Sequence, residues 1–68
     1  MNEKIFNSFL NLLGKDDYLV LHLINNDVVV TCLDEMTLIP YSNFIRCQNV
    51  NNEDTVVVPL ANIVYVTF

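Results

Sequence analysis

Glycine is almost absent from this chain, since Gly14 is the only one among 68 residues. A glycine-rich loop that would cradle a phosphate is therefore excluded. Basic residues are scarce as well: the chain has three of them and eight acidic residues, and its formal charge is −5. Duplex nucleic acid is bound through several clustered cations, so a large electrostatic footprint for a duplex is also excluded. The three cations are Lys4, Lys15 and Arg46.

Cysteine and histidine are too few and too scattered for a metal site. Cys32 and Cys47 have no CxxC spacing and no neighbouring histidine, and each lies in an apolar strand pattern. Reduced, buried thiols are the expected state, and a disulfide between them stays an alternative. His22 stands alone in a strand, which favours a packed or interface role over metal binding. We expect neither a metal nor any other cofactor.

Catalytic and membrane-spanning signals are missing too. No serine or cysteine has a base at a plausible spacing, and the adjacent Asp34 and Glu35 would point to opposite faces of a strand. We therefore do not expect an enzyme. The longest apolar run is far too short for a membrane span, and the start, Met-Asn-Glu-Lys, does not resemble a signal peptide. We predict a cytoplasmic protein without membrane contact.

The pattern changes once along the chain, from helical to strand-like. Residues 3–13 predict one amphipathic helix, for which Asn2 is the expected N-cap. From Tyr18 onward, apolar segments alternate with short turns rich in Asn and Asp, which predicts strands. The expected strands cover about 18–25, 28–35, 43–50, 55–59 and 63–68. The apolar helix positions are Ile5, Phe6, Phe9, Leu10, Leu12 and Leu13.

This order of one helix and five strands predicts a single domain over residues 1–68 with a mainly β fold. Five strands this short are expected to curl into a strongly bent antiparallel small barrel, with the N-terminal helix over one open end. Hydrophobic residues make up 53% of the sequence, yet a domain of this length buries only about 60% of the surface of its unfolded chain. Part of the apolar surface is therefore expected in a subunit interface.

The last two predicted strands are the most informative part of the chain. They contain no charged residue, and only Leu60-Ala61-Asn62 and the preceding proline separate their apolar runs. Edge strands are normally protected by charges or by additional prolines against pairing with other chains, and apart from Pro59 at the break these two strands have neither. We predict that copies of the chain pair through them. The predicted interface residues are Val56, Val57, Val58, Ile63, Val64, Tyr65 and Val66.

Several segments resemble the Sm-like family, which includes bacterial Hfq. Phe9-Leu-Asn-Leu-Leu13 resembles the Phe-Leu-Asn stretch of the Hfq helix, and Asn25-Asn26 stands where the family usually has Asn-Gly. Residues 56–66, Val-Val-Val-Pro-Leu-Ala-Asn-Ile-Val-Tyr-Val, match the spacing of the second Sm motif: an apolar strand, a short turn, an isoleucine and another apolar strand. A helical turn before the last strand is typical of Sm-like and SH3-like folds.

The resemblance implies a homo-oligomeric ring of about five to seven copies, in which the fourth strand of one subunit pairs with the fifth strand of the next. It also implies single-stranded RNA near the ring pore. Tyr41 is the candidate for stacking on a base, and Asn43 and Asn62 are candidates for reading base edges. The structural alternatives are a tyrosine packed in a turn and two asparagines that cap the loop and the 3₁₀ turn.

The chain departs from the family where RNA-binding residues are expected. The turn over residues 59–62 carries no charge, and the Tyr-Lys-His element of Hfq is missing. The segment before the third strand has no clear Asp-x-x-x-Asn pattern. A structural or protein-interaction ring without nucleic-acid binding therefore stays the alternative function.

Overall fold

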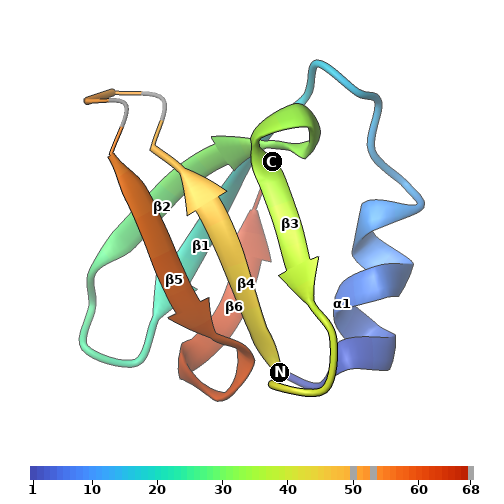
Figure 1. The fold of residues 1–68 in the computed structure, drawn as a ribbon, viewed down its shortest axis with the longest axis vertical. Coiled ribbons are helices and arrows are strands. Elements are labelled where there is room, and N and C mark those ends of the chain that lie inside the picture. Colours follow the sequence, from blue (N-terminus) through green and yellow to red (C-terminus); the bar gives the residue numbers. More distant parts are fainter. Residues whose placement is uncertain (50, 53, 68) are drawn as a thin grey trace.

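The computed structural model describes residues 1–49, 51–52 and 54–67. In this part of the chain, one α-helix, α1 (Glu3–Leu10), precedes six β-strands, as Figure 1 shows. The strands are β1 (Tyr18–Leu23), β2 (Val28–Cys32), β3 (Met36–Ile39), β4 (Phe44–Gln48), β5 (Thr55–Pro59) and β6 (Ile63–Thr67). Two 3₁₀ turns interrupt them: η1 (Leu33–Glu35) before β3, and η2 (Leu60–Asn62) before β6. The prediction of a mainly β fold with an N-terminal helix is confirmed.

α1 begins as the sequence predicts and ends earlier. The side chain of Asn2 accepts a hydrogen bond from Ile5 N at 2.9 Å and so acts as the N-cap. The predicted extension of the helix to residue 13 is wrong, because α1 ends at Leu10. Beyond it, Leu12 N and Leu13 N donate to carbonyls three residues earlier, at 3.0 and 3.2 Å. These bonds tighten the chain into 3₁₀-like turns, which close the helix.

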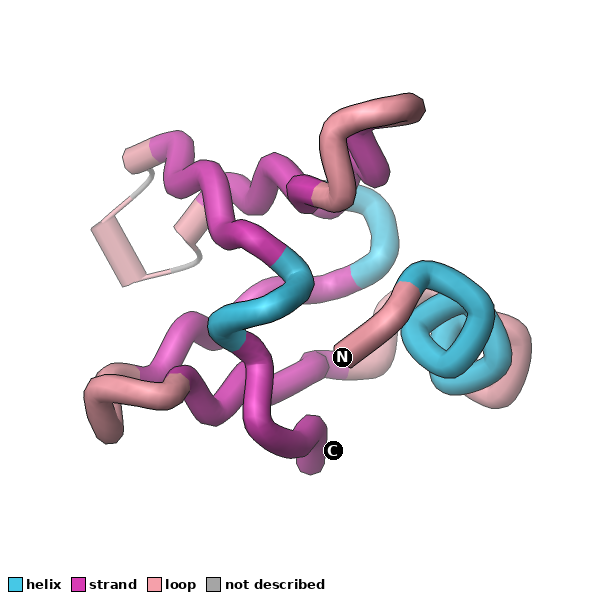
Figure 2. Tube along the Cα trace, turned by 90° about the horizontal axis from the view of Figure 1, so that it is seen from below, coloured by secondary structure: helices cyan, strands magenta, loops and turns pink. Residues whose placement is uncertain are grey.

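The strands form two three-stranded antiparallel sheets. Sheet A has the order β2-β1-β6, and sheet B has the order β3-β4-β5. Figure 2 shows the two sheets as layers, with α1 beside them and η2 passing from one layer to the other. Among the described residues, no helix has the length and apolar character that crossing a membrane requires.

The sequence predicts a five-stranded barrel, and the structure differs from it at one bend. The strand predicted over 28–35 ends at Cys32, because residues 33–35 turn as η1. Residues 36–39, which the sequence analysis leaves as a connection, form β3 and pair with β4. Met36 and Leu38 pack against the core while Thr37 between them is exposed, so β3 does carry the alternation of a half-buried strand. The strands therefore divide into two sheets, joined along the chain at η1 and again at η2, instead of closing into a barrel.

The other predicted boundaries hold more closely. The strand over 55–59 and the turn at Leu60-Ala61-Asn62 are confirmed. The strand predicted over 18–25 ends at Leu23, where the hairpin turn begins. The strand predicted over 43–50 is Phe44–Gln48, and its predicted end at Val50 lies outside the described residues. The last strand runs from Ile63 to Thr67, and Phe68 also lies outside the described residues.

The core lies between the two sheets and is closed on one side by the helix. Phe6 of α1 is completely buried, as are Leu19 and Leu21 of β1. Thr31 is the one buried polar residue of the described chain, and its hydroxyl donates to the Gln48 carbonyl of the other sheet at 3.3 Å. The buried apolar residues are Phe6, Leu19, Leu21, Val29, Ile45, Cys47, Val58, Leu60 and Ile63.

Candidate functional site

Two turns meet at one end of the molecule, the lower end in Figure 1. One is the β3–β4 turn over residues 40–43, and the other is η2. Leu60 N donates a hydrogen bond to Asn43 O at 2.8 Å and so joins the two turns. The structure therefore places the turn that carries Tyr41 and Asn43 against the turn that carries Asn62. We call this part of the surface, with its three predicted RNA-contacting residues, the turn end.

Tyr41 is unusual in both its backbone and its side chain. Its φ is 67°, in the left-handed region that a bulky residue rarely adopts and that costs roughly 1–3 kcal/mol. Its relative exposure is 104%, so the ring packs on nothing within the described chain. The structural alternative, a turn tyrosine packed on its neighbours, is therefore wrong. Neither packing nor backbone preference explains a tyrosine at this position, and its fully exposed aromatic ring is available for stacking.

The two asparagines of the turn end differ in their backbone roles. Asn43 also has a positive φ, 54°, which asparagine tolerates better than most residues. Asn62 ends η2, and its carbonyl oxygen accepts a hydrogen bond from Ile24 N at 2.8 Å. Both residues are exposed. Their backbones thus fix the turn end, while both residues are exposed to solvent.

The outer edge of β5 carries backbone groups that β4 does not use. In an antiparallel pair of strands, residue pairs that are hydrogen-bonded alternate with pairs that are not. The bond from Leu60 N to Asn43 O shows which pairs of β4 and β5 are the bonded ones. Thr55 and Val57 consequently direct their N–H and C=O groups away from β4. Pro59 directs only a carbonyl outward, because proline has no N–H. β5 is therefore a free edge with two donors and three acceptors.

The outer edge of β6 is free near its end, while at its start Ile63 O accepts a hydrogen bond from the N-terminal ammonium of Met1 at 3.3 Å. At the turn between β1 and β2, Leu23 N donates a hydrogen bond to Asp27 O at 2.9 Å. Every second residue of β1 is bonded to β2 in this way, so Leu21 also directs its N–H and C=O groups toward β2. Val66 lies opposite Leu21 in β6 and directs its own groups outward. The register shifts between His22 and Leu23, which marks a β-bulge near the start of this edge.

The seven predicted interface residues fall into three groups by burial. Val57, Val64 and Tyr65 are exposed, and Val56 and Val66 are half-buried. Val58 and Ile63 are each only 2% exposed, so their side chains belong to the core of the subunit. The backbone of Val58 is directed toward Ile45 of β4, and Ile63 O accepts a hydrogen bond from the N-terminal ammonium of Met1 at 3.3 Å, so neither residue is free to contact a neighbouring copy.

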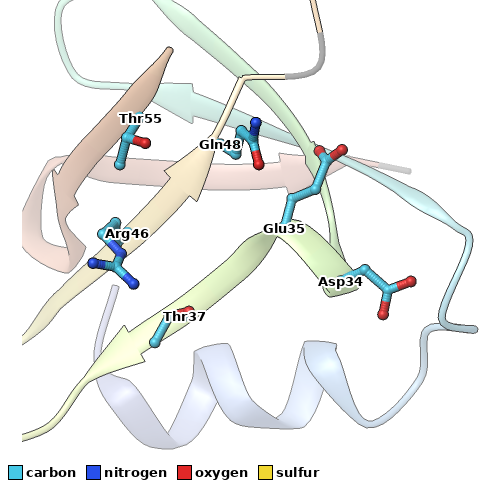
Figure 3. Close-up of a pocket in the computed structure, with 6 residues that line it drawn as sticks. All are labelled: Asp34, Glu35, Thr37, Arg46, Gln48 and Thr55. Atoms are coloured by element: carbon cyan, nitrogen blue, oxygen red, sulfur yellow. The ribbon is translucent and has the colours of Figure 1, made fainter. Parts of the chain in front are cut away.

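A polar hollow lies on the outer face of sheet B, as Figure 3 shows. It has a volume of about 390 Å³ and contains Arg46, the only cation of the strands. Glu35 borders it, and one of its carboxylate oxygens is buried without a hydrogen-bond partner in the described chain. The lining residues are Asp34, Glu35, Thr37, Arg46, Gln48 and Thr55. The sequence analysis missed this hollow, because it depends on β3, which was not predicted.

A second feature that the sequence analysis missed is a stacked pair on the outer face of sheet A. The rings of His22 and Tyr65 lie 4.1 Å apart between centroids, with an angle of 10° between their planes. His22 Nε2 also lies 2.9 Å from Thr67 Oγ1. The pairing register of β1 with β6 places these residues opposite one another, and no local pattern predicts that register. The expectation of a packed or interface histidine agrees with this position.

The two cysteines are both free, and they differ in environment. Cys47 is completely buried in β4, and burial raises the pKa of its thiol from the ordinary 9.0 to about 11. Cys32 is half-buried in β2. Among the described residues, no group of three or more His, Cys, Asp or Glu side chains is arranged to hold a metal ion.

Alkaline pH is expected to destabilise the protein through Cys47. Between pH 9.0 and about 11 the unfolded thiol releases its proton while the folded one keeps it, so the free energy of unfolding falls as pH rises. The slope from this group is at most ~1.4 kcal/mol per pH unit. Urea denaturation across this range should show a smaller decline for Cys47→Ala than for wild type. Cys32→Ala is the control and should decline like wild type; equal declines for all three proteins would contradict the assignment.

Comparisons of the chain with models of protein families, with curated proteins and with solved structures found no match.

Proposed function

We propose that this chain is a subunit of a Sm-like ring that holds single-stranded RNA at the turn end. The observation that carries the proposal is Tyr41, a fully exposed aromatic ring on a left-handed backbone. Strained residues that persist without a packing role are concentrated at functional sites. An exposed aromatic ring and two exposed amides on adjoining turns suit an unpaired base, which would stack on the ring and present its edges to Asn43 and Asn62.

Assembly into a ring is supported by the free edges of β5 and β6. Neither strand contains a charged residue, and each directs unpaired backbone groups outward. The two edges belong to different sheets, so pairing β5 of one copy with β6 of the next is a heterologous contact, which gives a cyclic oligomer when the rotation between copies closes. About five to seven copies would repeat the turn end around one axis.

The charge of the chain favours stacking over phosphate binding. Only three basic residues stand against eight acidic ones, and Lys15 already lies 3.6 Å from Asp34. Arg46 lies in the hollow on sheet B, away from the turn end. Few counterions would be released per chain, so we expect weak binding with a shallow dependence on salt.

A ring that binds proteins and no nucleic acid is the second candidate. The observation that favours it is the uncharged turn Leu60-Ala61-Asn62 together with the net charge of −5. A ring of such subunits repels a polyanion at long range. For either candidate we propose a cytoplasmic location, because both cysteines are free and one is a core residue.

Replacement of Tyr41 by alanine is expected to weaken RNA binding by roughly 5- to 150-fold, because stacking on one base contributes ~1–3 kcal/mol. Fluorescence anisotropy with short U-rich and A-rich RNAs across a salt series measures this effect. Tyr41→Phe keeps the ring and should bind like wild type. Tyr18→Ala removes another exposed tyrosine, 61% exposed in β1, and is the matched control.

Two outcomes would redirect the proposal. A steep salt dependence with an unaffected Tyr41→Ala variant would move the RNA-binding surface away from the turn end. A ring that binds neither RNA at low salt would leave the protein-interaction ring as the function. If RNA stacks at the turn end, Arg46→Ala is expected to lose less affinity than Tyr41→Ala.

A further inference from the structure

The helix α1 and the turn after it carry two parallel apolar stripes. The inner stripe is Phe6, Leu10 and Leu13, spaced by four and three residues along one helical face. Phe6 is completely buried, and Leu10 and Leu13 pack against the core. This stripe attaches α1 to the sheets together with Met1, which packs against the core and whose ammonium donates to Leu60 O at 2.9 Å.

The outer stripe, formed by Ile5, Phe9 and Leu12, has the same spacing and lies beside the inner one. Leu12 lies in the 3₁₀-like turn that follows α1, and the bond from its N–H to Phe9 O at 3.0 Å ties it to the last turn of the helix. Ile5 is 49% exposed and Leu12 is 74% exposed, while Phe9 is half-buried. An exposed row of large apolar side chains is typical of an interaction surface.

We propose that the outer stripe binds the outer stripe of a second copy of this chain. The stripe is self-complementary under a two-fold axis. When two helices lie antiparallel, Ile5 of one copy faces Leu12 of the other, and the two Phe9 rings meet near the axis. The opposite dipoles of the antiparallel helices are also favourably aligned.

Charge complementarity supports this antiparallel arrangement. Lys4 adjoins the start of the stripe, and three acidic or basic residues follow its end. Lys15 Nζ lies 3.6 Å from Asp34 Oδ1 and forms an ion pair with it. Asp17 Oδ2 accepts a hydrogen bond from Gly14 N at 2.7 Å. Asp16 has no such local contact among the described residues. The antiparallel pair brings Asp16 of one copy toward Lys4 of the other at both ends of the contact.

The area that the outer stripe can bury indicates how stable a contact it forms. A stable interface buries roughly 1,000 Å² or more, and three side chains per copy supply only a fraction of that area. A single pair of copies is therefore transient. The inference rests on the proposed ring, which repeats the contact once per subunit and makes it multivalent. A two-fold contact repeated by a cyclic axis produces two rings joined through their helices.

The test compares two double variants that add the same charges to opposite faces of the helix. Ile5→Lys with Leu12→Lys alters the outer stripe, and Asn7→Lys with Asn11→Lys alters the exposed polar face. Light scattering should give the mass of two rings for wild type and for the polar-face variant, and half that mass for the stripe variant. Circular dichroism melts verify that each variant is folded.

Cross-linking provides a measurement that does not depend on charged substitutions. Ile5→Cys and Leu12→Cys, each in a Cys32→Ser background, should form a disulfide with one another when mixed and oxidised, and neither should form one alone. Absence of the mixed disulfide, or equal yields with Asn7→Cys as the partner, would overturn the antiparallel contact.

The outcomes separate this inference from the ring proposal. A wild type with the mass of one ring, unchanged in the stripe variant, overturns the helix contact and leaves the ring. A wild type in concentration-dependent exchange between monomer and dimer, with a stripe variant that stays monomeric, supports the helix contact and overturns the ring. A stripe variant that loses the ring itself places the stripe in the ring interface and overturns the inference.

Discussion

The Val57→Pro variant is expected to remain folded and to lose all higher assembly. Val57 directs its N–H to the free edge of β5, so proline removes a donor that only a neighbouring subunit would use. The ladder between β5 and β4 keeps all its hydrogen bonds, and the loss of monomer stability should be about 1 kcal/mol. Light scattering at micromolar concentration should give a monomer where wild type gives a ring.

A matched control for this variant exists on another edge. Val28 begins β2, where its backbone groups point away from β1 by the same alternation, and it is 49% exposed against 52% for Val57. Val28→Pro places the same residue in an equally exposed edge position outside the predicted interface, and it should assemble like wild type. Assembly of Val57→Pro at the wild-type mass would show that β5 is not a subunit contact. A monomeric wild type would contradict the ring altogether.

The Phe6→Ala variant is expected to be largely unfolded. Truncation of a completely buried phenylalanine removes ~3–5 kcal/mol, through lost burial and the cavity that remains. A chain of 68 residues has a free energy of unfolding of roughly 3–10 kcal/mol, so this one change removes much of it. Urea denaturation followed by circular dichroism measures the loss.

The control is Leu12→Ala, which truncates an apolar residue of the same segment that is 74% exposed. It should stay within ~0.5 kcal/mol of wild type when measured at low protein concentration. A Phe6→Ala variant as stable as wild type would mean that α1 contributes nothing to the core, and that the two sheets are stable without it.

Much of the fold follows from local patterns in the sequence. The switch from helical to strand periodicity, the Asn-rich turns and the uncharged last strands all predict elements that the structure contains. The error lies at Leu33–Ile39, where Asp34, Glu35 and Pro40 indicate a connection. The chain makes only one brief turn there and then forms β3, because Met36 and Leu38 have core positions to fill. β3 pairs with β4 as a hairpin across residues 40–43, and the alternation of Met36, Thr37 and Leu38 is the local signal that the acidic residues and the proline obscure.

The candidate site was predictable by residue type and not by geometry. Tyr41, Asn43 and Asn62 could be named from the resemblance to Sm-like proteins, yet a left-handed tyrosine contradicts the usual backbone preference for that residue. The contact between the two turns depends on a hydrogen bond between residues seventeen positions apart, Leu60 and Asn43. The stacking of His22 on Tyr65 likewise depends on a register that is set by the whole of sheet A.

The turn η2 has a consequence for how many copies any closed assembly contains. Leu60 N is bonded to the β3–β4 turn and Asn62 O to Ile24 of the first hairpin, each at 2.8 Å, while the Leu60 side chain is buried. These anchors hold β5 and β6 at a fixed angle to one another. In an assembly that joins β5 of one copy to β6 of the next, that angle is the step by which each subunit turns from its neighbour. The copy number would then be a property of the isolated subunit, set by three residues before any two copies meet.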